Sequence, residues 1–231
     1  AAALFSATAM PGAATQLVAP QQPGPGVAGG IITPHFTVRL RDANGNDVTT
    51  SGVAVGVALS AGSGTLLGTT SRNSDVTGAV GFDDLIIQAA GTGKQLTASS
   101  GVLTSAVSSS FDLTAGSAAN LTFDVQPSNA VSGVAITPAV KVKVTDAFAN
   151  PVPLELVSLS LVGGGTLSGY LPTSTDVNGI ATFATLSVDL AGSKQLNAST
   201  TSLGPVASNS FDITAGAATQ LVATQQPGPG V

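Results

Sequence analysis

Short runs in which apolar and polar residues alternate occur along the whole chain. The clearest run is 36–41, where Phe36, Val38 and Leu40 alternate with threonine and arginine. Residues 140–145 repeat the pattern with valine, lysine and threonine. Because successive side chains of a β-strand point to opposite faces, both runs predict strands with one buried and one solvated face.

Turn-forming residues divide each half of the chain into about seven such segments, and no window shows sustained helical periodicity. Seven short strands in about 100 residues are typical of an immunoglobulin-like β-sandwich. We therefore expect an all-β chain of tandem immunoglobulin-like sandwiches. The expected strands are 16–19, 36–41, 53–57, one after the glycine-rich turn 62–64, and three around Phe82, Leu96 and Phe111; their counterparts are 121–125, 140–145, 157–161, one after 163–165, and three around Phe183, Leu196 and Phe211.

An internal repeat sets the domain organisation. Residues 13–27 return at 217–231 with one difference, Pro20 against Thr224, and 118–127 is a weaker copy. Blocks between these copies recur in the same order. We expect two whole repeats, 13–116 and 117–216. Residues 1–12 are then the end strand of a preceding repeat or an N-terminal arm, and 217–231 is the first strand of a further, incomplete repeat.

Composition excludes several classes of protein. Charged residues make up 8% of the 231 residues and hydrophobic residues 43%, which argues against disorder. The absence of cysteine excludes disulfides, thiolate metal sites and thiol nucleophiles. A net charge of −5 argues against nucleic-acid binding. No apolar stretch is long enough to span a membrane.

Three blocks recur in the same order: Asp-x-x-Gly-Asn-x-Val, then Gly-Thr-Leu, then Thr/Ser-Asp-x-x-Gly-x-Ala. In this order and spacing they resemble bacterial immunoglobulin-like repeats of the invasin/intimin type. The first repeat has Asp42, Gly45 and Asn46 in place, whereas the second has Ala149 where the family has glycine. The resemblance implies a non-catalytic stalk domain of a surface-exposed or extracellular protein.

Oxygen-bearing side chains suggest calcium at two places. Asp42, Asn44 and Asn46 provide oxygen ligands at alternate positions with a turn glycine, as at the start of a calcium loop, but Val53 stands at the twelfth position. The alternative is a hairpin turn without metal. A calcium ion at a repeat junction would use Asp112, Asp124 or Asp212. We expect no cofactor other than such an ion.

Other polar residues point to no catalytic site. The only histidine, His35, is replaced by Ala139 in the second repeat, and Asp83-Asp84 is replaced by alanine and threonine. Arg39 and Arg41, like Lys141 and Lys143, form a basic stripe on one strand face, suited to solvent or to an acidic neighbouring subunit. Lys94 and Lys194 recur, but no glutamate recurs beside them for an isopeptide cross-link. We therefore expect no enzyme.

The expected function is a structural repeat array that forms an extracellular stalk or fibre. Its expected partners are neighbouring repeats of the same chain or identical subunits in a filament. Two alternatives remain open. One is an adhesin module that binds a receptor or glycan, for which the single tyrosine, Tyr170, offers little aromatic surface. The other is a filament subunit that polymerises by strand addition through the end segments.

Overall fold

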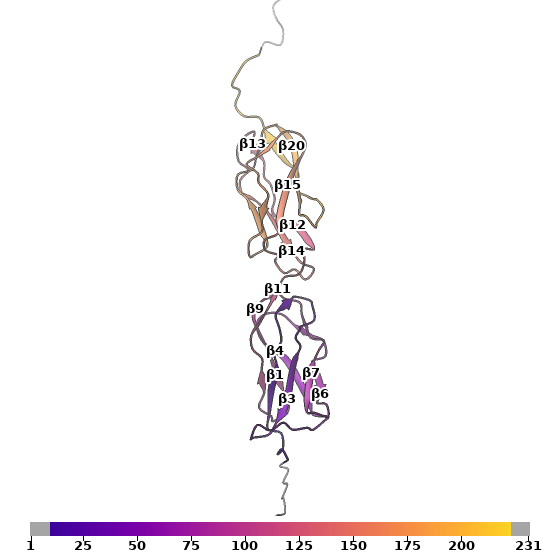
Figure 1. Cartoon of the computed structure of the whole chain (residues 1–231). Coiled ribbons are helices and arrows are strands. Elements are labelled where there is room, and N and C mark those ends of the chain that lie inside the picture. The colour runs from indigo at the N-terminus through magenta and orange to yellow at the C-terminus, as the bar shows by residue number, and fades with distance from the viewer. Residues whose placement is uncertain (1–9, 223–231) are drawn as a thin grey trace, which may run out of the picture. The chain divides into compact units, whose positions relative to one another are not determined.

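The computed structural model describes residues 10–222 and contains no helix in that range, and so none that could cross a membrane. The residues form two compact units (Figure 1). Unit 1 comprises the chain up to Ser117 together with the segment 146–150, and unit 2 comprises the rest. The expected end strand within residues 1–12 lies largely outside the described residues.

Unit 1 is a sandwich of two main sheets, ordered β1-β3-β7 and β2-β11-β9-β4-β6, with β10 paired to β9 and a small β5–β8 ladder. All neighbours are antiparallel except β2 and β11, which run parallel. The strands are β1 (Gln16–Gln21), β2 (Gly26–Val27), β3 (Phe36–Arg41), β4 (Ala54–Ala61), β5 (Leu66–Leu67), β6 (Ser71–Asn73), β7 (Ala79–Phe82), β8 (Ile86–Ile87), β9 (Gly91–Ser99), β10 (Ala106–Val107) and β11 (Phe111–Thr114).

Unit 2 repeats this topology in its own sheets, β12-β14-β18 and β13-β22-β20-β15-β17, with β21 on β20 and a β16–β19 ladder. Here β13 and β22 are the parallel pair. The strands are β12 (Asn120–Val125), β13 (Ala130–Val131), β14 (Val140–Thr145), β15 (Leu156–Val162), β16 (Leu167–Ser168), β17 (Thr173–Ser174), β18 (Ile180–Phe183), β19 (Ser187–Val188), β20 (Gly192–Ser199), β21 (Val206–Ala207) and β22 (Phe211–Thr214).

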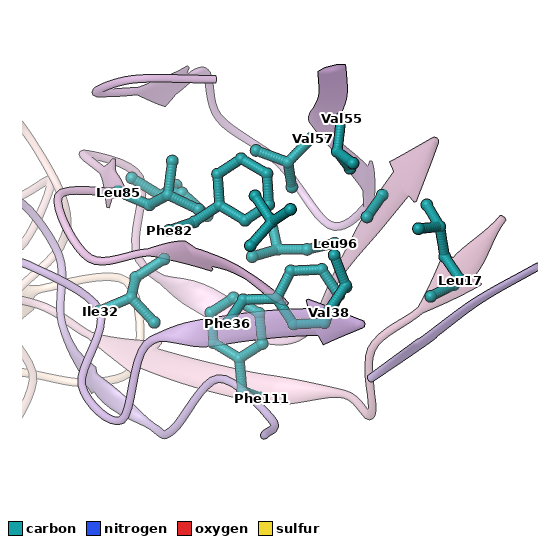
Figure 2. Packing of buried hydrophobic residues seen from close by; sticks show 14 of the residues in the cluster. Leu17, Ile32, Phe36, Val38, Val55, Val57, Phe82, Leu85, Leu96 and Phe111 are labelled. Carbon is teal, nitrogen blue, oxygen red and sulfur yellow. The ribbon is translucent and has the colours of Figure 1, made fainter. Parts of the chain in front are cut away.

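The core of unit 1 lies between its sheets and consists of aliphatic residues and phenylalanine (Figure 2). Phe36 and Val38 from β3 face Val55 and Leu96 from the other sheet, and all four side chains are fully buried. The intervening residues of β3 remain half-buried at the surface. The alternation of the sequence therefore becomes the two faces of the strand, and β14 shows the same pattern.

The all-β prediction is confirmed, and each strand expected within the two repeats is present. The two-residue strands β2, β8 and β10, with their counterparts, were missed because two residues carry no readable periodicity. Residues 217–222 form no strand, and Leu221 is fully exposed there, unlike its counterpart Leu17 in β1, which is buried. The remainder of the expected further strand, 223–231, lies outside the described residues.

The cationic residues share one property: all seven lysines and arginines lie in paired strands. They are Arg39 and Arg41 in β3, Arg72 in β6, Lys94 in β9, Lys141 and Lys143 in β14, and Lys194 in β20.

Within residues 10–222, two residues other than glycine adopt a left-handed backbone, Ala149 with φ of 64° and Leu154 with φ of 62°. Gly45 and Gly52 stand at the corresponding positions of the first repeat and have φ of 83° and 82°. Glycine has no Cβ and adopts this conformation without steric cost. The second repeat therefore retains the turn geometry without the residue that suits it best.

We expect Leu154→Gly to raise the free energy of unfolding of unit 2 by roughly 0.5–1 kcal/mol. The left-handed backbone costs an L-residue about 1–2 kcal/mol, which exceeds the extra backbone entropy of glycine, and the Leu154 side chain is 82% exposed, so little burial is lost. Urea denaturation of variant and parent measures the change. Leu156→Gly, inside β15, is the matched control and should destabilise. A loss of stability in Leu154→Gly would contradict the backbone argument.

Candidate functional site

The loop 42–46 is built around the Asp42 carboxylate. Its Oδ1 accepts hydrogen bonds from the backbone N–H groups of Asn44 and Asn46, both at 2.9 Å. Its Oδ2 accepts from the Gly12 N–H at 2.8 Å and from the Asn46 amide at 3.0 Å. The loop 146–150 has the same arrangement, with Asp146 accepting from Gly116, Phe148 and Asn150. Both carboxylates therefore close a turn and tie it to the chain that precedes β1 or β12.

These hydrogen bonds favour the ionised carboxylate. The Asn46 side chain and the Gly12 N–H lower the pKa of Asp42 to about 2. Burial raises the pKa of Asp146, but the hydrogen bonds from Asn150 and Gly116 outweigh burial and hold the pKa below its usual value. The negative charge is thus part of the folded loop.

We expect unit 1 to lose stability as the pH falls from about 4 towards 2. The pKa of Asp42 in the folded chain lies below the ordinary aspartate value of 3.8, so the unfolded chain binds more protons in this window and acid favours unfolding. Asp42→Asn should be less stable at neutral pH and should depend less on pH between 4 and 2. Urea midpoints at a series of pH values measure both effects.

Asp124→Asn is the control for that experiment, because it makes the same change of charge at an exposed position of β12. An Asp42→Asn variant that matched the parent at neutral pH would show that the carboxylate does not hold the loop.

Further buried polar residues form matched pairs that bind backbone groups. The Ser108 hydroxyl accepts from the Leu96 N–H at 2.9 Å and donates to the Ser109 carbonyl, and Ser208 does the same in unit 2. Ser74 accepts from the Val53 N–H, and Thr175 accepts from the corresponding N–H of Glu155. These side chains replace backbone partners where a loop leaves a sheet.

Lys94 and Lys194 are also buried, with exposures of 0% and 3%. The Lys94 Nζ donates to the Ser63 carbonyl at 2.6 Å, and the Lys194 Nζ donates to the Gly163 carbonyl at 2.7 Å. Burial lowers the pKa of Lys94. Each ammonium group anchors a glycine-rich turn onto the long central strand. The sequence carried this signal as a recurring Lys-Gln-Leu, but not the burial.

The basic stripe has different surroundings in the two units. In unit 1, Asp47 bridges Arg39 and Arg41 at 2.7 and 2.9 Å, and these hydrogen bonds lower the pKa of Asp47. In unit 2, Pro151 stands at the position of Asp47, and Lys141 and Lys143 remain half-buried on β14. One carboxylate within unit 1 therefore compensates one of the two positive charges of its stripe. Contact with an acidic neighbouring subunit stays a prediction.

The neighbouring carboxylates of Asp83 and Asp84 are paired with the same arginine. Arg72 bridges their carboxylates at 2.6 and 3.0 Å, and Asp84 also accepts hydrogen bonds from Thr69, which lower its pKa. His35 lies half-buried before β3, near Gly81. The Tyr170 hydroxyl accepts a hydrogen bond from the Leu159 N–H at 3.0 Å. The centroid of its ring lies 6.2 Å from the centroid of the Phe183 ring. Tyr170 thus belongs to the packing of unit 2.

The remaining calcium candidates lie apart from one another in the sequence and carry structural contacts. Asp112 accepts from the Gly93 N–H at 2.8 Å, the Asp212 N–H donates to Asn129, and Asp124 is exposed on β12. Within residues 10–222, no three acidic or histidine side chains are grouped closely enough to hold a metal ion. Calcium at Asp42, Asn44 and Asn46, or at a repeat junction, stays a prediction.

Comparison with known proteins identifies the fold. No protein-family model matches the chain, and no curated protein matches it. A solved chain of FdeC, an adhesin of Escherichia coli, matches with a TM-score of 0.50 and 17% identity over 90% of this chain and 67% of the solved chain. InvD of Yersinia pseudotuberculosis gives 0.49 and 17% over 90% and 60% of the two chains. The D0–D1 domain of intimin gives 0.34 and 21% over 87% and 98%.

At these identities the likeness concerns the fold. The chain consists of immunoglobulin-like β-sandwiches of the kind found in bacterial adhesins, and the resemblance to invasin/intimin-type domains is confirmed at that level. A shared fold leaves the function to be argued from the residues themselves.

Proposed function

We propose that the chain is a non-catalytic part of an adhesin-type surface protein and acts there as an extracellular spacer that carries tension. One observation carries the proposal: in each unit a strand near the start of the sandwich pairs in parallel with its last strand. In unit 1 Gly26 and Val27 of β2 lie opposite Leu113 and Thr114 of β11. In unit 2 Ala130 and Val131 of β13 lie opposite Ile213 and Thr214 of β22.

Parallel pairing determines how a pulling force is distributed. When the two ends of a unit are drawn apart, β2 and β11 are pulled along their own axes in opposite directions. The hydrogen bonds that join them, including the 2.8 Å bond from the Ala28 N–H to the Thr114 carbonyl, are then loaded together. An antiparallel pair that is loaded at adjacent ends instead opens one bond at a time. The geometry therefore favours resistance along the chain.

The polar residues that recur between the units support a non-catalytic role. Asp42, Ser74, Lys94 and Ser108 have buried counterparts in the second repeat, and all of them bind backbone groups. The residues that were candidates for catalysis have no such counterparts. What the chain retains twice is its scaffold, and an adhesin stalk requires little else.

Single-molecule pulling on the cysteine-free chain tests the proposal. Handles are attached to unit 1 at Ala13→Cys, from which force reaches β2 through β1, and at Ser117→Cys, just beyond the end of β11. The control uses Ala61→Cys and Gln95→Cys, which lie opposite each other in the antiparallel β4–β9 pair. We expect the first geometry to unfold at the higher force and to release up to roughly 3.3–3.6 Å for each residue between the handles. Equal or lower force through the ends would overturn the proposal.

A further inference from the structure

One buried polar residue has no buried counterpart. The buried side chains Asp42, Ser74, Lys94 and Ser108 match Asp146, Thr175, Lys194 and Ser208, but Asn150 is buried with 8% exposure while its counterpart Asn46 is exposed. Because the two residues occupy the same place in the same loop, the difference must come from what covers Asn150.

In unit 1 the Asn150 amide is seated on a backbone segment. Its Oδ1 accepts from the Ala90 N–H at 2.8 Å, and its Nδ2 donates to the Gln88 carbonyl at 2.8 Å. Phe148 of the same loop packs against Gly29, where an added Cβ would come within 2.0 Å of the ring. The seat for segment 146–150 therefore consists of a glycine turn at 28–30 and the segment 88–90 that follows β8.

The loop 42–46 has the same internal frame. In both loops the aspartate N–H donates to the carbonyl of the asparagine at 3.0 Å. In both, the asparagine backbone N–H and side-chain amide donate hydrogen bonds to the aspartate carboxylate. The Oδ2 atom of that carboxylate also accepts a hydrogen bond from the N–H of a glycine that precedes the first strand, Gly12 or Gly116. Asn46 is thus held as Asn150 is held, with its amide at the surface.

Unit 2 carries the counterpart of the seat. Gly133 corresponds to Gly29, has φ of 75°, and an added Cβ there would meet nothing within 4 Å. Asp189 and Ala191 correspond to Gln88 and Ala90, and both are exposed. Apolar side chains surround this seat at the surface: Val131 at 41% exposure, Val134 at 54% and Leu190 at 52%.

We propose that the loop 42–46 of one copy of the chain docks on the seat 132–134 and 189–191 of a second copy. The Asn46 amide then bridges the Asp189 carbonyl and the Ala191 N–H, as the Asn150 amide bridges Gln88 and Ala90. The Asp189 carbonyl already accepts from Ser132, but a carbonyl oxygen has a second lone pair. The docking loop is held within its own copy, because the Gly12 N–H of that copy donates a hydrogen bond to Asp42.

The contact joins a loop of one copy to a seat of the other, so the two copies use different surfaces. Every pair therefore still has one free seat and one free loop, and further copies can add head to tail. Two amide hydrogen bonds and a few apolar side chains form a small interface, so the association is weak and transient. The inference goes beyond the proposed function and does not depend on it, since self-association and resistance to force are measured separately.

Cysteine cross-linking tests the docking, because the chain has no cysteine of its own. The full chain carrying Asn46→Cys and Ala191→Cys is oxidised mildly at high concentration. We expect disulfide-linked dimers and higher multimers to form several-fold faster than in the control, Asn46→Cys with Ser202→Cys, which places the second thiol on another exposed loop of unit 2. A rate equal to that of the control would overturn the proposal.

Two further variants keep that outcome interpretable. Asn150→Cys with Ala90→Cys should close a disulfide within one chain and shows that this pair of positions lies within reach of a disulfide bond. In the chain without cysteines, Ala191→Pro removes the N–H that Asn46 would meet, and the concentration-dependent rise of mass in sedimentation equilibrium should disappear. If the calibrating pair closes and Ala191→Pro self-associates as the parent does, the seat is not the docking site.

Discussion

Truncation of Phe36 to alanine is expected to lower the free energy of unfolding of unit 1 by about 3–5 kcal/mol. Phe36 is 0% exposed and lies directly opposite Phe82 in the β3–β7 pairing, with the two rings stacked at 6.4 Å. The core has no tryptophan and no disulfide to compensate for the lost ring. The cavity would open between the two sheets (Figure 2).

Hydrogen exchange of β3 and β9 peptides, followed by mass spectrometry across a urea series, measures the unfolding of unit 1 directly. Val102→Ala is the control, because Val102 is fully exposed, and it should change the stability little. A loss below about 1 kcal/mol for Phe36→Ala would mean that the sheets close over the cavity or that Phe36 is not at the centre of the core.

Replacement of Gly78 by alanine should destabilise unit 1 more than replacement of Gly45 by alanine. Both glycines are left-handed, with φ of 75° and 83°. A Cβ on Gly45 would meet nothing within 4 Å, so Gly45→Ala bears only the backbone strain of about 1–2 kcal/mol. A Cβ on Gly78 would lie 1.9 Å from the Val48 carbonyl oxygen, which belongs to the backbone and cannot turn away.

The steric conflict at Gly78 should add roughly 1–3 kcal/mol to the same backbone strain. Urea denaturation of both variants gives the two losses of stability, and their difference isolates the contact between the turn 75–78 and the backbone at Val48. Equal losses in the two variants would show that the turn 75–78 can move away from Val48. Gly179→Ala repeats the comparison in unit 2, where the Val144 carbonyl oxygen would lie 2.5 Å from the new Cβ.

The sequence predicted most of the fold because the decisive signals were local. The alternation around Val38 and Val142 produced β3 and β14, and the Asp-x-x-Gly blocks at Asp75 and Asp176 became turns in which the aspartate accepts N–H groups of its own turn. Lys94 was harder to interpret, because its burial depends on a glycine-rich turn about thirty residues away in the sequence. Local periodicity does not report such a distant partner.

The loop 42–46 shows more clearly what the sequence alone does not determine. Oxygen atoms at alternate positions, as in Asp42, Asn44 and Asn46, suit both a calcium loop and a turn closed by N–H donors. Only the structure shows that both oxygens of Asp42 accept N–H groups. Asn46 and Asn150 occupy equivalent positions in the sequence, yet Asn46 is exposed and Asn150 is buried. This difference likewise depends on which residues pack against each loop.

The placement of every lysine and arginine in a paired strand has a consequence for the chain outside a cell. A protease that cuts after basic residues must draw several residues of its substrate into an extended conformation in its own cleft. Six of the seven cleavable bonds lie inside a paired strand, and the seventh, after Arg41, joins the end of β3 to the loop 42–46. Digestion by such an enzyme at the six strand bonds then proceeds only through opened molecules, so cleavage there is set by how often the sheets open.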